Sequence, residues 1–336
     1  MAAFDPEAAA DPGSGIYGLD APESEAAVVL VPVPFAATVS YGGGAELGPA
    51  AILAASHQVD LFDFHFGRVY ERGIHLQAPD AEVVAAHARG RAAAVEVIAA
   101  GGAVAGSSAC DEVDAAGALV NRSLAARVAP LLDAGKVVGV LGGDHSVPFA
   151  AIEAAAARGP LGILHVDAHA DLRVAYEGFH WSHASIMHNV LEACPGVQRL
   201  VQIGIRDYSE GELRAVHASE GRVLTHFDAE WQRRRFRGVT FDELCEEALA
   251  ALPDRVWVSV DIDGLDPKLC PNTGTPVPGG LQFAELAHLL QRLAESGREV
   301  VGFDLVEVAP GDDEWDANVG ARVLYKLCGA ALRSRG

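Results

Sequence analysis

The sequence predicts an α/β fold in which helices flank a parallel sheet. Half of the 336 residues are hydrophobic and 21% are charged, a balance that allows a large core. Short runs rich in Val, Ile and Leu alternate with longer stretches rich in Ala, Leu and Glu. The short runs lack the alternation of polar and apolar residues that marks half-exposed strands, so we expect both faces of the sheet to be buried.

Six short runs are predicted to be strands. In chain order they span 27–33, 137–141, 161–166, 200–205, 255–261 and 299–305. The longer segments between them, such as 80–100 and 283–296, are predicted to be helices. Residues 1–25 have no periodicity and are expected to form a flexible arm. Because no linker or internal repeat follows, residues 26–336 are predicted to form a single domain.

The charge balance excludes some classes of partner. The chain has 46 acidic and 25 basic residues, a net charge of −21, so its mean field repels nucleic acids and anionic membranes. The first basic residue is Arg68, so the start lacks the positive region of a secretory signal, and no apolar run approaches about 18 residues. The five cysteines are scattered without a C-x-x-C pair, which indicates structural thiols. We expect a soluble, cytoplasmic protein.

Polar side chains follow the ends of three predicted strands. His145 lies in a Gly-Gly-Asp-His-Ser turn at 142–146. Asp167, His169 and Asp171 occupy every second position, so an extended backbone would place them on one side. The carboxyl ends of parallel strands meet at one edge of a sheet, where ligands bind, so we expect these side chains to converge there.

A further acid pair, Asp261 and Asp263, follows the strand at 255–261. Each cluster alone is also typical of a helix cap or a turn. Together, so many buried carboxylates would be costly without cations, and two divalent ions would neutralise most of the repulsion. Imidazole and carboxylate ligands without sulfur favour Mn²⁺ or a similar first-row ion over a structural zinc.

Four segments resemble the signature motifs of the ureohydrolases, the arginase and agmatinase superfamily. They are Gly-Gly-Asp-His-Ser at 142–146, Asp-Ala-His-Ala-Asp at 167–171, Ser-Val-Asp-Ile-Asp-Gly-Leu-Asp-Pro at 259–267 and Gly-Thr-Pro-Val-Pro-Gly-Gly at 274–280. The resemblance runs from about Val29 to Val308. It implies a three-layer α/β/α fold with a central, mostly parallel sheet and a binuclear manganese centre, in which Co²⁺ or Ni²⁺ could replace manganese. The implied ligands are His145, Asp167, Asp171 and Asp261 for one ion and Asp167, His169, Asp261 and Asp263 for the other.

The resemblance also implies a mechanism. Paired cations lower the pKa of a bridging water, and the resulting hydroxide would attack the guanidinium carbon. His183 matches the family's Ser-His-Ala element and would shuttle protons, a task suited to a side chain that titrates near pH 6 to 7. Glu307 matches the carboxylate that holds the guanidinium, and Asp171 joins both residues in the catalytic set.

The motifs leave open which chemical group the substrate carries at the end away from its guanidine. Where arginases carry an Asn and an Asp for the amino-acid end of arginine, this chain has Arg173 and Ser209. The Asp-Ala-His-Ala-Asp-Leu-Arg and Ser-His-Ala strings are more similar to agmatinases, which make putrescine and urea from agmatine for polyamine metabolism. Arg173 would instead suit a carboxylate, so guanidinobutyrate, guanidinopropionate or formiminoglutamate are also candidate substrates.

Two further functions are compatible with the motifs: an arginase, and a non-catalytic subunit that binds metal without turnover. A dinucleotide-binding module is excluded because residues 34–37 read Pro-Phe-Ala-Ala, with no Gly-rich turn. The resemblance implies a small guanidino substrate as partner and a homotrimer or homohexamer.

Overall fold

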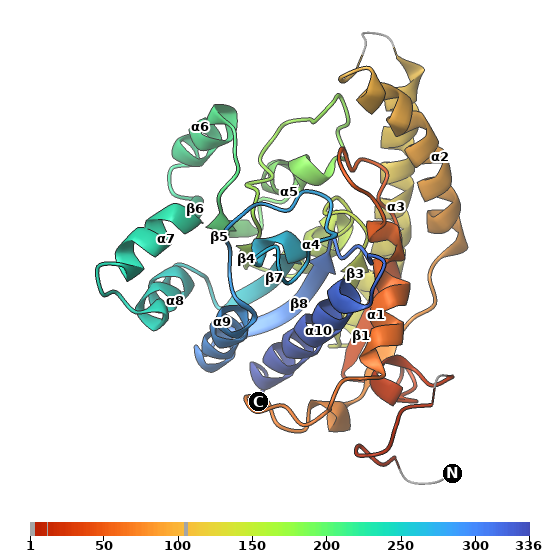
Figure 1. Cartoon of the computed structure of the whole chain (residues 1–336), viewed down its shortest axis with the longest axis vertical. Coiled ribbons are helices and arrows are strands. Elements are labelled where there is room, and N and C mark those ends of the chain that lie inside the picture. The colour runs from red at the N-terminus through yellow and green to blue at the C-terminus, as the bar shows by residue number, and fades with distance from the viewer. Residues whose placement is uncertain (1–3, 12, 104–106) are drawn as a thin grey trace.

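The computed structural model describes residues 4–11, 13–103 and 107–336. Within these residues, eight strands form one parallel sheet in the order β2-β1-β3-β8-β7-β4-β5-β6 (Figure 1). The strands are β1 Val28–Val33, β2 Ile74–Leu76, β3 Val137–Gly142, β4 Leu161–Val166, β5 Val197–Ile205, β6 Val223–Phe227, β7 Arg255–Asp261 and β8 Glu299–Val306. Every residue of β1, β3 and β4 is buried, which accounts for their continuous apolar sequence.

Helices cover both faces of the sheet (Figure 1). The helices are α1 Gly48–Ser56, α2 Ala81–Ala99, α3 Ser108–Asp133, α4 Phe149–Ala156, α5 Ile186–Ala193, α6 Glu210–Ala218, α7 Asp228–Arg235, α8 Phe241–Ala250, α9 Phe283–Glu295 and α10 Trp315–Arg333. Alternate residues of β1 divide between the two faces. Val28 and Leu30 share a core cluster with residues of α1, α8, α9 and α10, whereas Val29 and Val31 share one with residues of α2, α3, α4 and α5. The predicted three-layer α/β/α architecture is confirmed.

All six predicted strands are present, and β5 begins three residues earlier than expected. The two strands that the sequence did not predict, β2 and β6, form the two edges of the sheet. Both are short, and most of their residues are only partly buried. They therefore lack the continuous apolar run by which the inner strands were identified.

Part of the segment expected to be a flexible arm packs on the domain. Ile16, Tyr17 and Leu19 belong to the same core cluster as α10. The Tyr17 hydroxyl donates a hydrogen bond to the carbonyl of Ala321 at 2.8 Å, and its ring centroid lies 4.8 Å from that of Tyr325. These apolar side chains within a polar stretch supply the burial that holds residues 16–19. The domain boundary at residue 26 stays a prediction.

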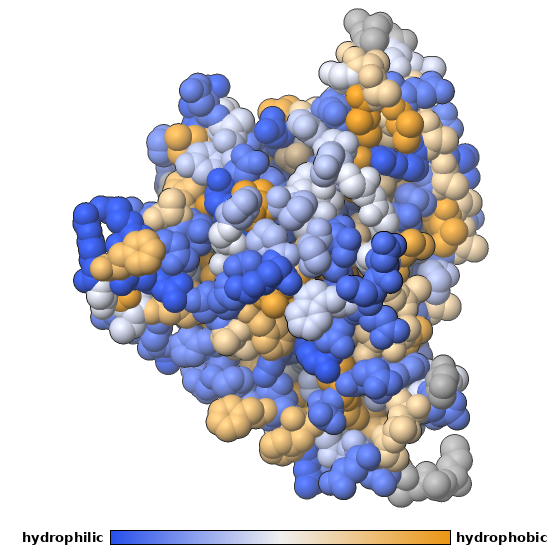
Figure 2. All heavy atoms as spheres, in the orientation of Figure 1, coloured by the Kyte–Doolittle hydropathy of each residue, from blue (hydrophilic) through white to orange (hydrophobic). Residues whose placement is uncertain are grey.

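One face of the surface can be seen in Figure 2. The face shown in Figure 2 is mostly hydrophilic, with hydrophobic side chains in small groups. No helix in the described ranges is long and apolar enough to cross a membrane. All five cysteines fall within the described residues and are free thiols, as the scattered spacing predicted.

The strands that carry the motifs are neighbours in the middle of the sheet. The order β3-β8-β7-β4 brings together the turns after these four strands, which lie far apart in the sequence. The turn after β3 requires glycine, because a Cβ at Gly143 would overlap the carbonyl oxygen of Phe35. This close approach lets the chain bend sharply before His145.

Candidate active site

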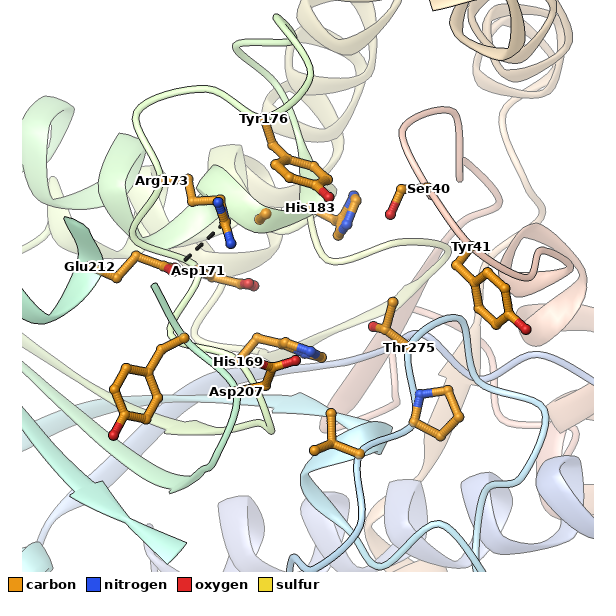
Figure 3. Close-up of a pocket in the computed structure, with 14 residues that line it drawn as sticks. Ser40, Tyr41, His169, Asp171, Arg173, Tyr176, His183, Asp207, Glu212 and Thr275 are labelled. Carbon is orange, nitrogen blue, oxygen red and sulfur yellow. Dashed lines mark ion pairs between the residues drawn. The ribbon is translucent and has the colours of Figure 1, made fainter. Parts of the chain in front are cut away.

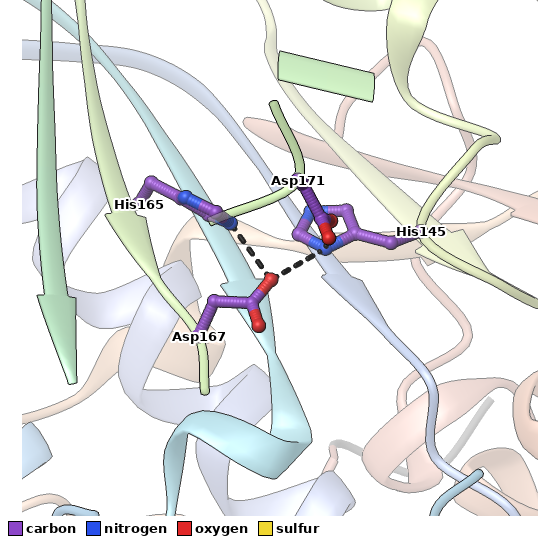
Figure 4. A group of neighbouring side chains, drawn as sticks. All are labelled: His145, His165, Asp167 and Asp171. Carbon is purple, nitrogen blue, oxygen red and sulfur yellow. Dashed lines mark hydrogen bonds and ion pairs between the residues drawn. The ribbon is translucent and has the colours of Figure 1, made fainter. Parts of the chain in front are cut away.

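His145 is surrounded by carboxylates from two other strands. Its Nδ1 atom lies 2.9 Å from Asp167 Oδ2, 3.2 Å from Asp171 Oδ2 and 3.4 Å from Asp261 Oδ2, and Figure 4 shows His145, Asp167 and Asp171 facing one another. All four residues are buried. Among the described residues, no atom makes a hydrogen bond with this nitrogen. Burial alone would lower the pKa of His145, but the surrounding carboxylates raise it well above its usual range. The converging oxygens thus favour a positive charge at this nitrogen, which a proton supplies in the free protein and a divalent cation could supply in its place.

The far side of the His145 ring fixes its tautomer. Ser259 Oγ donates a hydrogen bond to Asp304 Oδ1 at 2.8 Å, and Trp257 Nε1 donates one to Asp304 Oδ2 at 2.6 Å. The Ser259 hydroxyl proton is thus committed, so at 2.9 Å from His145 Nε2 its oxygen accepts the ring N–H. Because Nε2 keeps its proton, Nδ1 is the ring atom that can release a proton and bind a metal ion, a common arrangement in metal-binding histidines.

A second group of ligand atoms adjoins the first. His169 Nδ1 lies 3.0 Å from Asp263 Oδ2 and 3.6 Å from Asp167 Oδ1. Asp167 belongs to both groups, as expected of a bridging ligand. Asp261 Oδ1 accepts a hydrogen bond from the Asp263 backbone N–H at 2.8 Å while Oδ2 faces His145, so its bridging role stays a prediction.

His165 also lies in the first group, although the sequence did not single it out. Gln202 donates hydrogen bonds from Nε2 to the Ala170 carbonyl and to His165 Nδ1, at 2.7 and 3.0 Å. The ring proton therefore sits on Nε2 and is donated to Asp167 Oδ2 at 2.8 Å. His165 orients the shared carboxylate and does not offer a ligand lone pair. The alternation of polar residues that includes Asp167, His169 and Asp171 already begins at His165. This pattern could have identified His165 from the sequence.

Burial sets the protonation of the cluster. Burial and the neighbouring charge of Asp167 raise the pKa of Asp171 to about 7. Burial alone would lower the pKa of His169, but the carboxylates of Asp263 and Asp167 raise it to about 12. Protons therefore balance the clustered negative charge, and a metal ion that bound here would displace them.

We expect the affinity for Mn²⁺ to rise with pH, with a smaller slope above about pH 7, where the Asp171 proton is already lost but the His169 proton, with a pKa of about 12, must still be displaced. Below that pH, the Asp171 proton must leave before a cation binds, which weakens the affinity by about tenfold per pH unit for each proton displaced. Calorimetric titration with Mn²⁺ from pH 5.5 to 8.5, in buffers of different ionisation enthalpy, counts the protons released. Binding that is independent of pH would contradict this assignment.

Glu307 follows β8 and reaches the turn that carries His145. Its Oε1 accepts a hydrogen bond from the His145 backbone N–H at 2.9 Å, and its own N–H donates to the Gly143 carbonyl at 2.8 Å. Burial and the nearby Asp144 raise the pKa of Glu307 well above its usual range, so a bound cation would favour the carboxylate. Both Glu307 and Asp171 have positive φ, at 60° and 53°, a strained conformation often found at functional sites.

His183 is held by the segment that follows β1. The Thr38 hydroxyl lies 3.1 Å from Asp144 Oδ2, to which it donates, and 3.1 Å from His183 Nδ1. Because a carboxylate only accepts, the Thr38 oxygen must accept the proton of His183 Nδ1, which leaves Nε2 unprotonated. Burial lowers the pKa of His183 to about 4, below the range of 6 to 7 that the sequence suggested. His183 is thus neutral near pH 7.

The two groups of candidate metal ligands adjoin a pocket of about 380 Å³ (Figure 3). Its lining combines proposed ligands, proton-transfer groups and outer residues: Ser40, Tyr41, His169, Asp171, Arg173, Tyr176, His183, Ala184, Asp207, Tyr208, Glu212, Thr275, Pro276 and Val277. Glu307 lies next to this lining, since a Cβ at Gly274 would be 3.6 Å from its Oε2. The pocket lining thus runs from the buried Asp171 to the partly exposed Arg173 and the exposed Asp207.

Arg173 is paired within the pocket. Its Nε lies 3.7 Å from Glu212 Oε2, and its guanidinium carbon lies 4.9 Å from the centroid of the Tyr176 ring. Glu212 is itself buried and caps α6 through Ser209. The sequence-based hypothesis that Arg173 binds a substrate carboxylate therefore requires that carboxylate to compete with Glu212.

Comparisons with known proteins agree with this geometry. The profile of the Arginase family matches residues 26–329. The chain is 35% identical to the N(1)-aminopropylagmatine ureohydrolase of Thermus thermophilus over 92% of both chains, and 32% identical to the agmatinase of Bacillus anthracis over 87% of both. The solved agmatine ureohydrolase of Thermoplasma volcanium superposes with a TM-score of 0.70 at 25% identity, covering 92% of this chain and 91% of that one. This chain therefore belongs to the arginase family, as a ureohydrolase similar to the agmatinase-like members.

Proposed function

We propose that this ureohydrolase cleaves agmatine to putrescine and urea with two Mn²⁺ ions. The observation that carries the proposal is the pair of ligand groups that share Asp167 beside the pocket. In the proposed site, one ion binds His145, Asp167, Asp171 and Asp261, and the other binds Asp167, His169, Asp261 and Asp263. When bound, such an ion pair supplies an acidified water and stabilises negative charge that develops in the transition state.

The residues around the proposed metal pair have distinct tasks. Glu307 Oε1 accepts a hydrogen bond from the His145 backbone N–H. We therefore assign the other oxygen, Oε2, to an ion pair with the substrate guanidinium, a planar cation that carboxylates bind well. His183 is neutral with a free Nε2, so it takes up there a proton released by the attacking water and delivers it to the amine nitrogen as the C–N bond breaks. Asp171 and the other proposed ligands hold the reacting groups in the orientation that the reaction requires.

A second candidate substrate is N1-aminopropylagmatine, which would yield urea and a longer polyamine. It is favoured by similarity to the ureohydrolases of Thermus thermophilus and Synechocystis, at 35% and 32% identity over at least 91% of this chain. Arg173 and Asp207 line the pocket and are partly exposed and exposed, so we expect a longer tail to leave the pocket on their side. Both candidates share the guanidine, the butyl chain and a cationic nitrogen.

A substrate panel tests the proposal. We expect Mn²⁺-loaded protein to release urea from agmatine or N1-aminopropylagmatine faster than from arginine, guanidinobutyrate or guanidinopropionate. Formiminoglutamate, which would release formamide in place of urea, is followed separately by loss of substrate. Preference for a carboxylated compound would overturn the assignment. No turnover on any of them, despite bound metal, would favour a non-catalytic subunit.

Arg173→Ala separates the amine-tailed from the carboxylated substrates. Because Arg173 is partly exposed and already paired with Glu212, we expect kcat/KM for agmatine to change by less than about fivefold. Steady-state kinetics with agmatine and guanidinobutyrate measure the effect. If the variant keeps its activity on agmatine but loses guanidinobutyrate hydrolysis, Arg173 binds the substrate carboxylate.

We further propose that the enzyme works in the cytoplasm as a homotrimer or homohexamer, as the family resemblance implies. Light scattering of the eluting protein during size-exclusion chromatography measures the assembly directly. A monomer at micromolar concentration would contradict this part of the proposal.

A further inference from the structure

The charged residues that line the pocket are paired, with one exception among the residues that the structure describes. His169 faces Asp263, Asp171 faces His145, and Arg173 faces Glu212. Asp207 also lines the pocket, but its carboxylate makes no ion pair or hydrogen bond with a described side chain or backbone group. An unpaired carboxylate in a substrate pocket is a candidate for recognition of a cation.

The backbone places Asp207 next to the metal-ligand groups. Residues 169 and 207 pair as a parallel bridge that extends β4 and β5, and the Asp207 N–H donates to the Ala168 carbonyl at 3.0 Å. Paired strands lie about 4.8 Å apart, and paired residues project to the same side. Figure 3 shows His169 and Asp207 together on one wall of the pocket. The carboxylate therefore lines the pocket beside His169, where the exposed side chain of Asp207 can be reached by a substrate tail.

The other acid on this wall is already engaged. Glu212 Oε2 accepts hydrogen bonds from the backbone N–H and the hydroxyl of Ser209, both at 2.8 Å, and Oε1 accepts one from the Leu172 N–H at 3.2 Å. Its remaining charge faces Arg173. Asp207 is thus the acid on this wall whose charge is not already paired. The neighbouring Tyr208 also lines the pocket, where its aromatic ring could pack against the methylene groups of a substrate tail.

We propose that Asp207 is the residue that selects an ammonium on the substrate tail. This inference rests on the proposed function and names the group that distinguishes amine-tailed guanidines from guanidino acids. The cationic nitrogen separated from the guanidine by a butyl chain, which agmatine and N1-aminopropylagmatine share, pairs with the Asp207 carboxylate. A tail that ends in a carboxylate meets repulsion at the same place.

The test compares Asp207→Asn with the wild-type enzyme on three probes: agmatine, the uncharged analogue butylguanidine and guanidinobutyrate. We expect kcat/KM for agmatine to fall by about tenfold, mainly through KM, because a charge-assisted hydrogen bond is lost. Butylguanidine should be unaffected, and guanidinobutyrate should improve. Glu210→Gln is the matched control, since Glu210 is the next acid along the chain, is exposed and does not line the pocket.

Two outcomes overturn the inference. One is an equal loss for agmatine and butylguanidine, which indicates a general structural role. The other is an unchanged KM for agmatine. If the wild-type enzyme turns over no amine-tailed guanidine, the proposed function fails, and calorimetric binding of agmatine and butylguanidine then decides the inference separately. Selective weakening of agmatine binding by Asp207→Asn would support it, and equal binding to both proteins would overturn it.

Discussion

Asp167→Asn is expected to remove both metal ions and to reduce urea release to less than about one thousandth of the wild-type rate. Asp167 is shared by the two clusters of contacting side chains and, with Asp261, is one of two proposed ligands of both ions. His165 and the His169 backbone N–H hold its two oxygens in place. Asparagine keeps the shape but removes the charge that binds a cation. Inductively coupled plasma mass spectrometry of the dialysed protein, together with urea release, measures both effects.

Two companion variants make this result specific. Asp263→Asn alters only the group around His169, so we expect one ion to be retained. Asp266→Asn changes an acid of the same sequence motif that bonds to Lys268 and Gln282, outside both groups, and should keep two ions and most of the activity. Retention of two ions by Asp167→Asn would contradict the shared-ligand assignment.

Thr38→Val is expected to lower kcat by about 100-fold while both ions stay bound. Without the hydroxyl, nothing fixes the proton of His183 on Nδ1, so the tautomer with a free Nε2 is no longer enforced. Asp144 keeps its hydrogen bonds from the Thr38 backbone N–H and from Ser146, so the turn that carries His145 should persist. Kinetics, metal content and ¹⁵N NMR of the imidazole measure the change.

Thr38→Ser supplies the control, because serine restores the hydroxyl and should recover most of kcat. The tautomer argument would fail if the valine variant were fully active. It would also fail if both variants lost activity and metal together, since that pattern indicates collapse of the turn and no specific role in proton transfer.

The inner part of the fold could be predicted because its strands are buried on both faces and read as continuous apolar runs. The edge strands β2 and β6 could not, since partial exposure interrupts that pattern. The packing of Ile16 and Tyr17 was missed for a similar reason. A few apolar residues in a polar segment carry no periodicity, and their partners on α10 lie about 300 residues away in the sequence.

That the motifs carrying the proposed ligands meet could be predicted from the sequence, because each follows a strand that ends at the same edge of the sheet. The structure brings His145, Asp167, Asp171 and Asp261 within contact distance and His169 next to Asp263. The supporting contacts were not predictable in the same way. The link from Thr38 to His183 joins residues 145 positions apart, and the hydrogen bonds that fix each imidazole tautomer depend on side chains from other strands. The pairing of Arg173 with Glu212 likewise requires the fold.

The central claim is that two metal ions in this site make the chain a ureohydrolase for an amine-tailed guanidine. The most direct test titrates metal-free protein with Mn²⁺ while urea release from agmatine and N1-aminopropylagmatine is followed. We predict negligible release without metal and a rise that levels off at two equivalents of Mn²⁺ per chain. Release that is complete at one equivalent, or that proceeds equally well in a chelator, would contradict the binuclear assignment.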